Sequence, residues 1–551
     1  MSSRSLPILF TAFVLSCAPA ATSPQHVEPP RPRFAATAVA RRVVLLSFDG
    51  LGADALARQK NLPAFERLAR EGASARIINV NPTLTAPTHV SILTGADPQR
   101  TGIVSNRFHL PGTPVEQEAR GLMVDPDVET LVEAARRQGK RVGAVSFPTI
   151  DNRSPRRTAD FGMAWGMPMV PARLVELTRD DFRREWVPPT WTERPQRRRS
   201  FSPIMRARVE WSVPRVTRAD VDVVAYDTTD DRTTNYDTYF VETGEREFDV
   251  RDWFAISSRT TSGLHGSWSK VLRTTPSLGV TIYWGAISRN QAWPESFLDL
   301  LDEQVGFWPG APEEGLEVEP AIFIDQLQRL AAHYTRAQTL AIERMPFDLL
   351  LAYQPQIDQA SHQYLGTPDA DRVIGTAFAA ADRGLAAIGE ALDPEDALIV
   401  TSDHGLIAIE REVLMNRLLA EKGFAPRWRA FSSGAIAHLY RFSGPDDSNA
   451  VVDMLTATGH FEKLEKKSTT SHRNSGDIIA TAYPGIALSS ADEPEQPHGH
   501  HGALNTHREL HPVLFAYGTG VTPGPLGEIS QTRIARYVAG LLGITPPAAA
   551  E

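Results

Sequence analysis

The sequence contains a single cysteine, Cys17, among its 551 residues. One cysteine excludes an intramolecular disulfide framework and any zinc site built from several thiolates. A basic charge balance is also missing, because the formal net charge is −9, and this argues against duplex nucleic acid as a partner. With 42% hydrophobic and 22% charged residues, the composition is that of a globular protein. The length fits one large enzyme core with an insertion.

The position of Cys17 in the sequence is as informative as the number of cysteines. Arg4 precedes a mostly apolar run from Leu6 to Leu15, and Ser16-Cys17 follows. This order is typical of a secretory signal peptide, and the run is too short to span a bilayer. The segment "VLSC" also resembles a bacterial lipobox, in which the cysteine is lipidated and becomes the first residue of the mature chain.

We therefore expect residues 1–17 to direct export and Cys17 to carry a lipid anchor facing the periplasm. The alternative is an ordinary cleaved signal peptide that leaves a periplasmic or secreted protein without an anchor. Residues 18–40 are rich in alanine and proline and predict a flexible tether.

Helices alternating with buried strands dominate the rest of the chain. The run "VVLLSF" at 43–48 predicts a strand buried on both faces of a parallel sheet. "NLPAFERLAREGA" predicts a helix that ends at Gly72. The same alternation recurs at 127–147, 323–358 and 375–405. The pattern favours an α/β core with helices on both faces of a mostly parallel sheet, over residues 41–164 and 312–551, and a β-rich insertion at 165–311.

Polar side chains follow three of these strands, where functional groups gather in α/β sheets. Carboxylate oxygens and imidazole nitrogens without thiolates suit zinc or a similar divalent ion. With one further histidine from "PHGHHGALN", there are enough ligands for two ions that share a substrate. The strand-end residues are Asp49, Asp358, His362, Asp403 and His404, and the histidines of the later segment are His498, His500 and His501.

The segment "NPTLTAPTHVSILTG" at 81–95 is rich in hydroxyl side chains, namely Thr83, Thr85, Thr88, Ser91 and Thr94. A threonine becomes a nucleophile only when its pKa is lowered. A divalent ion at the predicted site would do this, but the segment by itself leaves open which hydroxyl is meant.

Six segments in order, "SFDGL", "NPTLTAPTHVSILTG", "TGIVSN", "IDQASH", "TSDHG" and "HHG", resemble the alkaline phosphatase superfamily, and most of all its type I phosphodiesterase/nucleotide pyrophosphatase branch. The resemblance implies an alkaline-phosphatase-like sandwich and two zinc ions. One ion would be held by Asp358, His362 and His501. The other would be held by Asp49, Asp403 and His404 and would contact Thr85.

Thr85 stands at the nucleophile position of the family, and Asn106 at that of its phosphate-contacting asparagine. The resemblance thus implies a covalent phospho-threonine that water later hydrolyses. The other hydroxyls of the segment are expected to serve the loop and the helix cap. His89 is expected to be structural, and His498 or His500 is the alternative to His501 as a ligand.

One departure bears on the substrate. Monoesterases of the superfamily carry a Lys-x-Arg pair that binds a dianionic phosphate, whereas "SFPTIDNRSPRR" has Arg153 with Asp151 in place of the lysine. This favours a phosphate diester or a nucleotide pyrophosphate bond, with Arg153 as a substrate contact. A monoesterase on the same scaffold is the alternative, and a non-catalytic surface lipoprotein is a third. A sulfatase is disfavoured because "TAPTH" lacks the C/S-x-P-x-R context of that branch.

Overall fold

The computed structural model describes residues 34–551 except 167, 185–199, 245, 313–315, 317 and 496. The predicted signal peptide with Cys17, and the tether as far as residue 33, lie outside the described residues. Among the helices that are described, none combines the length and the apolar character needed to cross a membrane.

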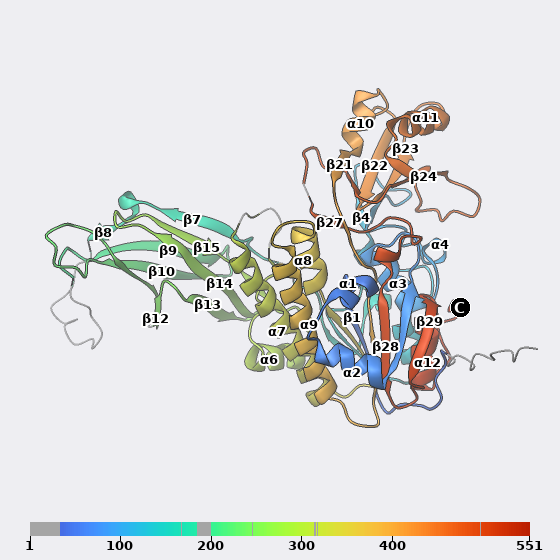
Figure 1. The fold of residues 1–551 in the computed structure, drawn as a ribbon, viewed down its shortest axis with the longest axis horizontal. Helices are drawn as coiled ribbons and strands as arrows, with labels where there is room; N and C mark the ends of the chain where they lie inside the picture. Colours follow the sequence, from blue (N-terminus) through green and yellow to red (C-terminus); the bar gives the residue numbers. More distant parts are fainter. Residues whose placement is uncertain are drawn as a thin grey trace, which may run out of the picture.

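A nine-stranded sheet forms the centre of the molecule (Figure 1). Every residue of β1 (Val43–Phe48) is buried, as expected for a strand covered on both faces. β1 pairs in parallel with both neighbours, β18 and β19, so the predicted mostly parallel sheet is confirmed. The strand order is β17 (Ala292–Trp293), β6 (Phe161–Met163), β5 (Val142–Val145), β18 (Leu349–Gln354), β1, β19 (Ala397–Thr401), β28 (Val513–Gly518), β2 (Ala73–Ile78) and β29 (Gly524–Ser530).

Helices cover both faces of this sheet. Val44, Leu46 and Phe48 point to one face, which packs against α2 (Pro63–Glu71), α6 (Glu295–Gln304), α7 (Pro320–Arg344), α8 (Gln356–Tyr364) and α9 (Ala370–Glu390). Val43 and Leu45 point to the other face, which packs against α3 (Thr85–Thr94), α5 (Leu131–Arg137) and α12 (Arg533–Leu542). This alternation follows from the two-residue period of a strand. Two short helices, α1 (Ala53–Arg58) and α4 (Pro98–Thr101), complete this part.

A β-sandwich projects from one side of the core (Figure 1). Its two antiparallel sheets share one apolar cluster, in which the indole of Trp211 donates a hydrogen bond to Ser267 Oγ at 2.8 Å. One sheet holds β8 (Arg183–Arg184), β9 (Met205–Val213), β10 (Thr217–Tyr226), β11 (Thr238–Thr243) and β12 (Arg246–Asp249). The other holds β7 (Arg173–Leu177), β13 (Trp253–Thr260), β14 (Gly263–Thr274), β15 (Val280–Trp284) and β16 (Ser288–Arg289).

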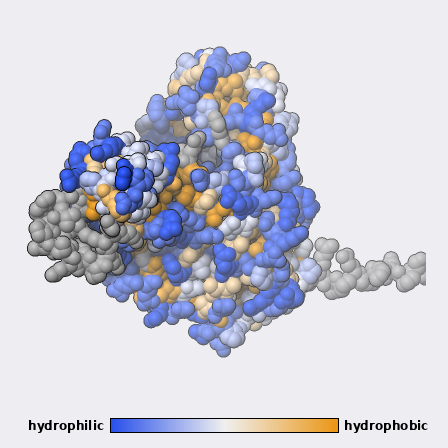
Figure 2. Space-filling model, turned by 60° about the vertical axis from the view of Figure 1, so that its left-hand side comes forward, coloured by the Kyte–Doolittle hydropathy of each residue, from blue (hydrophilic) through white to orange (hydrophobic). Residues whose placement is uncertain are grey.

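The sandwich occupies part of the segment 165–311. At the end of that segment, β17 belongs to the central sheet and α6 packs in the core cluster. The face of the molecule that Figure 2 shows is mostly hydrophilic, with separate hydrophobic patches.

A smaller α/β unit with its own apolar cluster lies beyond β19 in the chain (top of Figure 1). Its main sheet holds β22 (Trp428–Ser433), β23 (Ile436–Arg441), β25 (Ile478–Ala482) and β24 (Phe461–Lys466), with α10 (Met415–Glu421) and α11 (Ser448–Thr458). Three two-stranded pairs complete the fold: β21 (Arg411–Leu414) with β26 (Ile486–Ser489), β20 (Ile407–Ala408) with β27 (Gly499–His500), and β3 (Arg107–Phe108) with β4 (Ala119–Arg120).

Candidate metal centre and nucleophile

Three adjacent parallel strands, β18, β1 and β19, bring three carboxylates to one edge of the sheet. Asp49 follows β1 directly, Asp403 follows β19 by two residues, and Asp358 lies in the first turn of α8, just after β18. Asp49 and Asp403 are fully buried, and the Asp358 side chain is 15% exposed. This proximity is expected from the sequence, because the carboxyl ends of parallel strands lie at the same edge of a sheet.

His404 joins Asp49 and Asp403 in one group of candidate ligands. Its Nε2 lies 3.0 Å from Asp403 Oδ2 and 3.7 Å from Asp49 Oδ1. One ligand atom from each of the three residues lies within 4.8 Å of the others. This spacing suits a divalent ion bound by two carboxylates and one imidazole.

Asp358 lies beside the other two predicted histidines. Its Oδ1 is 3.3 Å from His362 Nε2 and 3.9 Å from His501 Nε2. The Nδ1 atoms of these rings face carbonyl oxygens, that of Gly499 at 2.8 Å and that of Thr83 at 3.1 Å. A carbonyl can only accept, so each Nδ1 carries the proton and each Nε2 keeps its lone pair for a metal.

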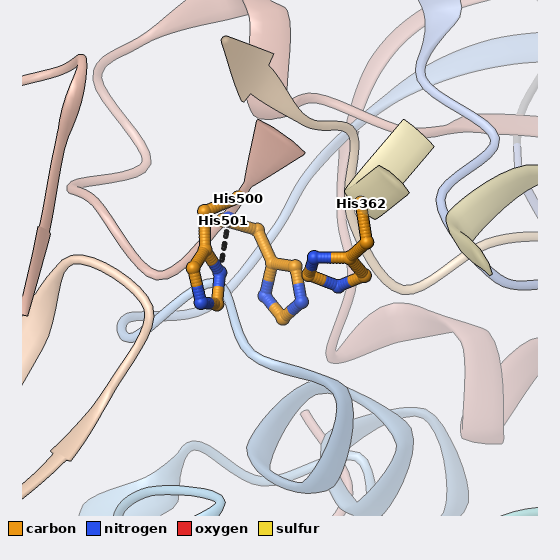
Figure 3. A group of neighbouring side chains, drawn as sticks. All are labelled: His362, His500 and His501. Atoms are coloured by element: carbon orange, nitrogen blue, oxygen red, sulfur yellow. Dashed lines mark hydrogen bonds between the residues drawn. The ribbon is translucent and has the colours of Figure 1, made fainter. Parts of the chain in front are cut away.

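His500 is also close to these rings, as Figure 3 shows. His362, His500 and His501 form a further group whose ligand atoms lie within 4.8 Å. However, His500 Nδ1 accepts a hydrogen bond from the backbone N–H of His501 at 3.0 Å. In a neutral ring the proton then sits on Nε2, so this hydrogen bond opposes ligation by His500. His498 is exposed, and the geometry favours His501 among the three.

The two sets of ligands adjoin each other. The rings of His404 and His501 stack with their centroids 3.6 Å apart, and Asp358, His404 and His501 also form a compact group. Two cations held by the two sets would therefore face a common space, as a site that binds both ends of one phosphate group requires.

The chemistry of the cluster fits divalent cations. Asp49 Oδ1, Asp358 Oδ1 and Asp403 Oδ2 are buried and have no hydrogen-bond partner among the described residues. Burial and the charges of Asp403 and Asp358 raise the pKa of Asp49 well above its usual value. Burial and the neighbouring His404, His362 and His500 lower the pKa of His501 well below its usual value. Cations would offset the carboxylate repulsion, and a neutral imidazole is the form that binds metal.

Hydrogen-bond donors from neighbouring residues bind one oxygen of Asp49 and one oxygen of Asp403. The hydroxyl of Tyr353 donates to Asp49 Oδ2, which leaves Oδ1 for a metal. Gly50 N–H at 3.3 Å and Ser402 Oγ at 3.2 Å donate to Asp403 Oδ1, which leaves Oδ2. Sequence reasoning missed Tyr353 because it reads as one more residue of the buried strand "FDLLLAYQ".

Thr85 is the hydroxyl that faces this cluster. It is the first residue of α3, and its Oγ1 lies 3.2 Å from His404 Nε2. Other hydroxyls of the segment are bound to carbonyl oxygens of the chain, among them Thr83 to Ala503 and Thr94 to Val90. Among the contacts of these hydroxyls, only that of Thr85 is with a candidate metal ligand in the part of the chain that is described.

Asn106 lies next to the nucleophile candidate. Its Oδ1 accepts the backbone N–H of Ala86 at 2.8 Å, which fixes the amide beside the first turn of α3. The N-terminus of a helix attracts anions such as phosphate. Thr85 and Asn106 therefore present a hydroxyl and an amide at the same helix end.

Arg153 is not brought to the cluster by any contact seen among the described residues. Its side chain is 58% exposed and its Nε lies 3.8 Å from Asp151 Oδ2, while its backbone N–H donates to Asp151 Oδ1 at 3.1 Å. In the loop after β5, the guanidinium of Arg153 therefore lies near Asp151, two residues earlier in the chain. A role in substrate binding stays a prediction for this residue.

Comparison with known proteins decides the family. Residues 43–504 match the sequence model of the type I phosphodiesterase/nucleotide pyrophosphatase family. The chain belongs to this family. Its members hydrolyse phosphate esters, so the predicted resemblance and enzyme class are confirmed. A search of curated proteins finds no match to this chain.

Solved structures show the same fold. Murine ectonucleotide pyrophosphatase/phosphodiesterase 5 is similar over 92% of this chain and 96% of its own, with 16% identity and a TM-score of 0.52. An inactive threonine-to-alanine variant of that mouse protein, in complex with AMP, has the same coverage and identity and a TM-score of 0.53. At this identity the likeness establishes the fold, which is the alkaline-phosphatase-like class predicted from the sequence.

Replacing Tyr353 by Phe tests whether its hydroxyl holds Asp49 for a metal. We expect zinc affinity to fall by about 10- to 100-fold, because partners of metal ligands typically contribute that much. Competition with a chromogenic chelator measures it. Tyr239→Phe is the matched control, since that buried hydroxyl donates to the Thr275 carbonyl inside the sandwich. Equal zinc affinity in both variants would contradict the role of Tyr353.

Proposed function

We propose that this chain hydrolyses phosphate diesters or nucleotide pyrophosphate bonds through a covalent phospho-threonine at Thr85, between two zinc ions. The observation that carries the proposal is the 3.2 Å approach of Thr85 Oγ1 to His404 Nε2 at the junction of the two ligand sets. Membership of the phosphodiesterase family supports the reaction class. The AMP bound to the related mouse enzyme supports a nucleotide as one substrate.

The two ligand sets are those that the family resemblance implies, and the distances among the described residues support them. Asp49, Asp403 and His404 would hold one ion, with Thr85 in reach of it, and Asp358, His362 and His501 would hold the other. Bound zinc ions supply positive charge and Lewis acidity, which lower the pKa of the threonine hydroxyl and offset charge on the phosphate.

The chain's own residues position the reaction. Thr85 Oγ1 loses its proton to solvent and forms a bond to phosphorus, while the bond from phosphorus to the leaving oxygen breaks on the opposite side and that oxygen departs with the electron pair. The Asn106 amide and the N-terminal end of α3 stabilise the charge on the transferred group. Water then attacks phosphorus, the bond to Thr85 Oγ breaks, and the free hydroxyl returns. β-Branching of Thr85 restricts its rotamers and helps keep the attacking oxygen in line.

Thr85→Ala tests the nucleophile. We expect kcat/KM to fall on the order of 10⁴-fold or more, because removal of a covalent nucleophile costs at least this much in well-studied hydrolases. Zinc binding should persist, since three other ligands hold each ion. Thr94→Ala is the control: it lies on the same helix and its hydroxyl donates to Val90 O at 2.7 Å, away from the ligands. Near-normal turnover in Thr85→Ala would refute the assignment.

The ratio of kcat/KM for bis-p-nitrophenyl phosphate to that for p-nitrophenyl phosphate tests the substrate class. We expect the diester to be preferred, because Asp151 stands where the family resemblance places the lysine of monoesterases. A dianionic monoester would therefore find no lysine at this position. Preference for the monoester would instead support the alternative, a phosphate monoesterase on the same scaffold.

A further inference from the structure

His89 lies one helical turn after Thr85 and is fully buried. Its ring meets three parts of the fold that build the site. Nδ1 lies 2.9 Å from the carbonyl oxygen of Thr85 and 3.4 Å from Asp403 Oδ2, and Nε2 lies 2.9 Å from Ser47 Oγ on β1. The ring therefore contacts the first turn of α3, which carries Thr85, and the candidate metal ligand Asp403. It also contacts β1, the strand that precedes Asp49.

These contacts fix the position of the proton on the ring. The Thr85 carbonyl can only accept, so Nδ1 carries the hydrogen, and in a neutral ring Nε2 then accepts from the Ser47 hydroxyl. At 3.4 Å, the Nδ1–H attracts Asp403 Oδ2 without forming a full hydrogen bond, so this oxygen stays available to a metal.

Aromatic neighbours hold the ring in this orientation. Phe147 and Tyr353 meet it edge to face, with ring centroids 5.4 Å and 5.5 Å away. Tyr353 in turn donates to Asp49. Rotation of the imidazole would thus disturb contacts to both carboxylates of the same predicted zinc ion.

We propose that His89 is a positioning residue. Its Nδ1–H aligns the first turn of α3, which carries Thr85, with Asp403. This alignment sets the distance between the Thr85 hydroxyl and the metal that Asp403 would hold. The inference rests on the proposed function, because it assigns His89 a task in the same reaction. It differs from a purely structural histidine, which would fill the same volume but have no requirement for a donor at one ring position.

Two substitutions separate these roles. Asn places an amide nitrogen at the δ position, where His89 has Nδ1, whereas Gln places it at the ε position. We expect His89→Gln to lose about 10- to 100-fold in kcat and in the affinity of the site that contains Asp403, with a smaller change in KM. His89→Asn should recover a large part of both losses. Zinc affinity is measured by chelator competition, independently of turnover.

The control is His333→Gln, which replaces another fully buried histidine, on α7, away from the ligands. It should lower thermal stability but leave kcat and zinc affinity near those of the wild type. Equal losses in His89→Asn and His89→Gln, or unchanged kcat and zinc affinity in both, would overturn the inference. If the wild type itself neither binds zinc nor cleaves phosphate esters, the proposed function fails instead, so the two failures are distinguishable.

Discussion

The repulsion of Asp49 by Asp403 and Asp358 is the interaction that any occupant of the site has to offset. The three residues follow neighbouring strands of the central sheet, and each has one buried oxygen without a hydrogen-bond partner among the described residues. Burying an uncompensated charge costs several kcal/mol even after relaxation. Burial and the neighbouring Asp403 and Asp358 raise the pKa of Asp49 well above its usual value. Bound divalent ions would convert the same repulsion into a strong electrostatic site.

The rest of the fold serves to hold those oxygens in place. Buried strands fix the backbone before Asp49 and Asp403, and Tyr353, Ser402 and Gly50 each donate a hydrogen bond to one oxygen of these carboxylates. Gly50 is required at its position because its φ is +73° and a Cβ there would come within 2.9 Å of the Asp358 Cα. The "DG" pair after β1 thus combines the candidate ligand Asp49 with the close approach of the segment that carries Asp358.

Much of this arrangement could be predicted from the sequence, because it depends on local patterns. The mostly apolar run Val43–Phe48, followed by Asp49, predicts both a buried strand and a polar group at its end, and the same logic applies to Asp403. The choice of His501 over His500 could not be predicted this way. It depends on a backbone carbonyl from Thr83 and a backbone N–H within the "HHG" segment, which only the folded chain brings into place.

Long-range contacts explain the other limits of sequence reasoning. The buried Tyr353 hydroxyl and the bridging position of His89 arise where strands and α3 meet in space. The unit around β22–β25 also gave no separate signal, since its short strands and helices continue the α/β alternation of the core. Arg153 was singled out by its position in a motif, but the loop after β5 directs it to Asp151.

The most direct test is a zinc titration of the metal-free protein in which activity toward a phosphate diester is followed together with bound metal. We expect two zinc ions per chain, with full turnover reached only when the second site fills, because one ion would lower the pKa of the Thr85 hydroxyl and the other would offset charge on the leaving oxygen. Full activity with one ion, or activity that persists without metal, would contradict it.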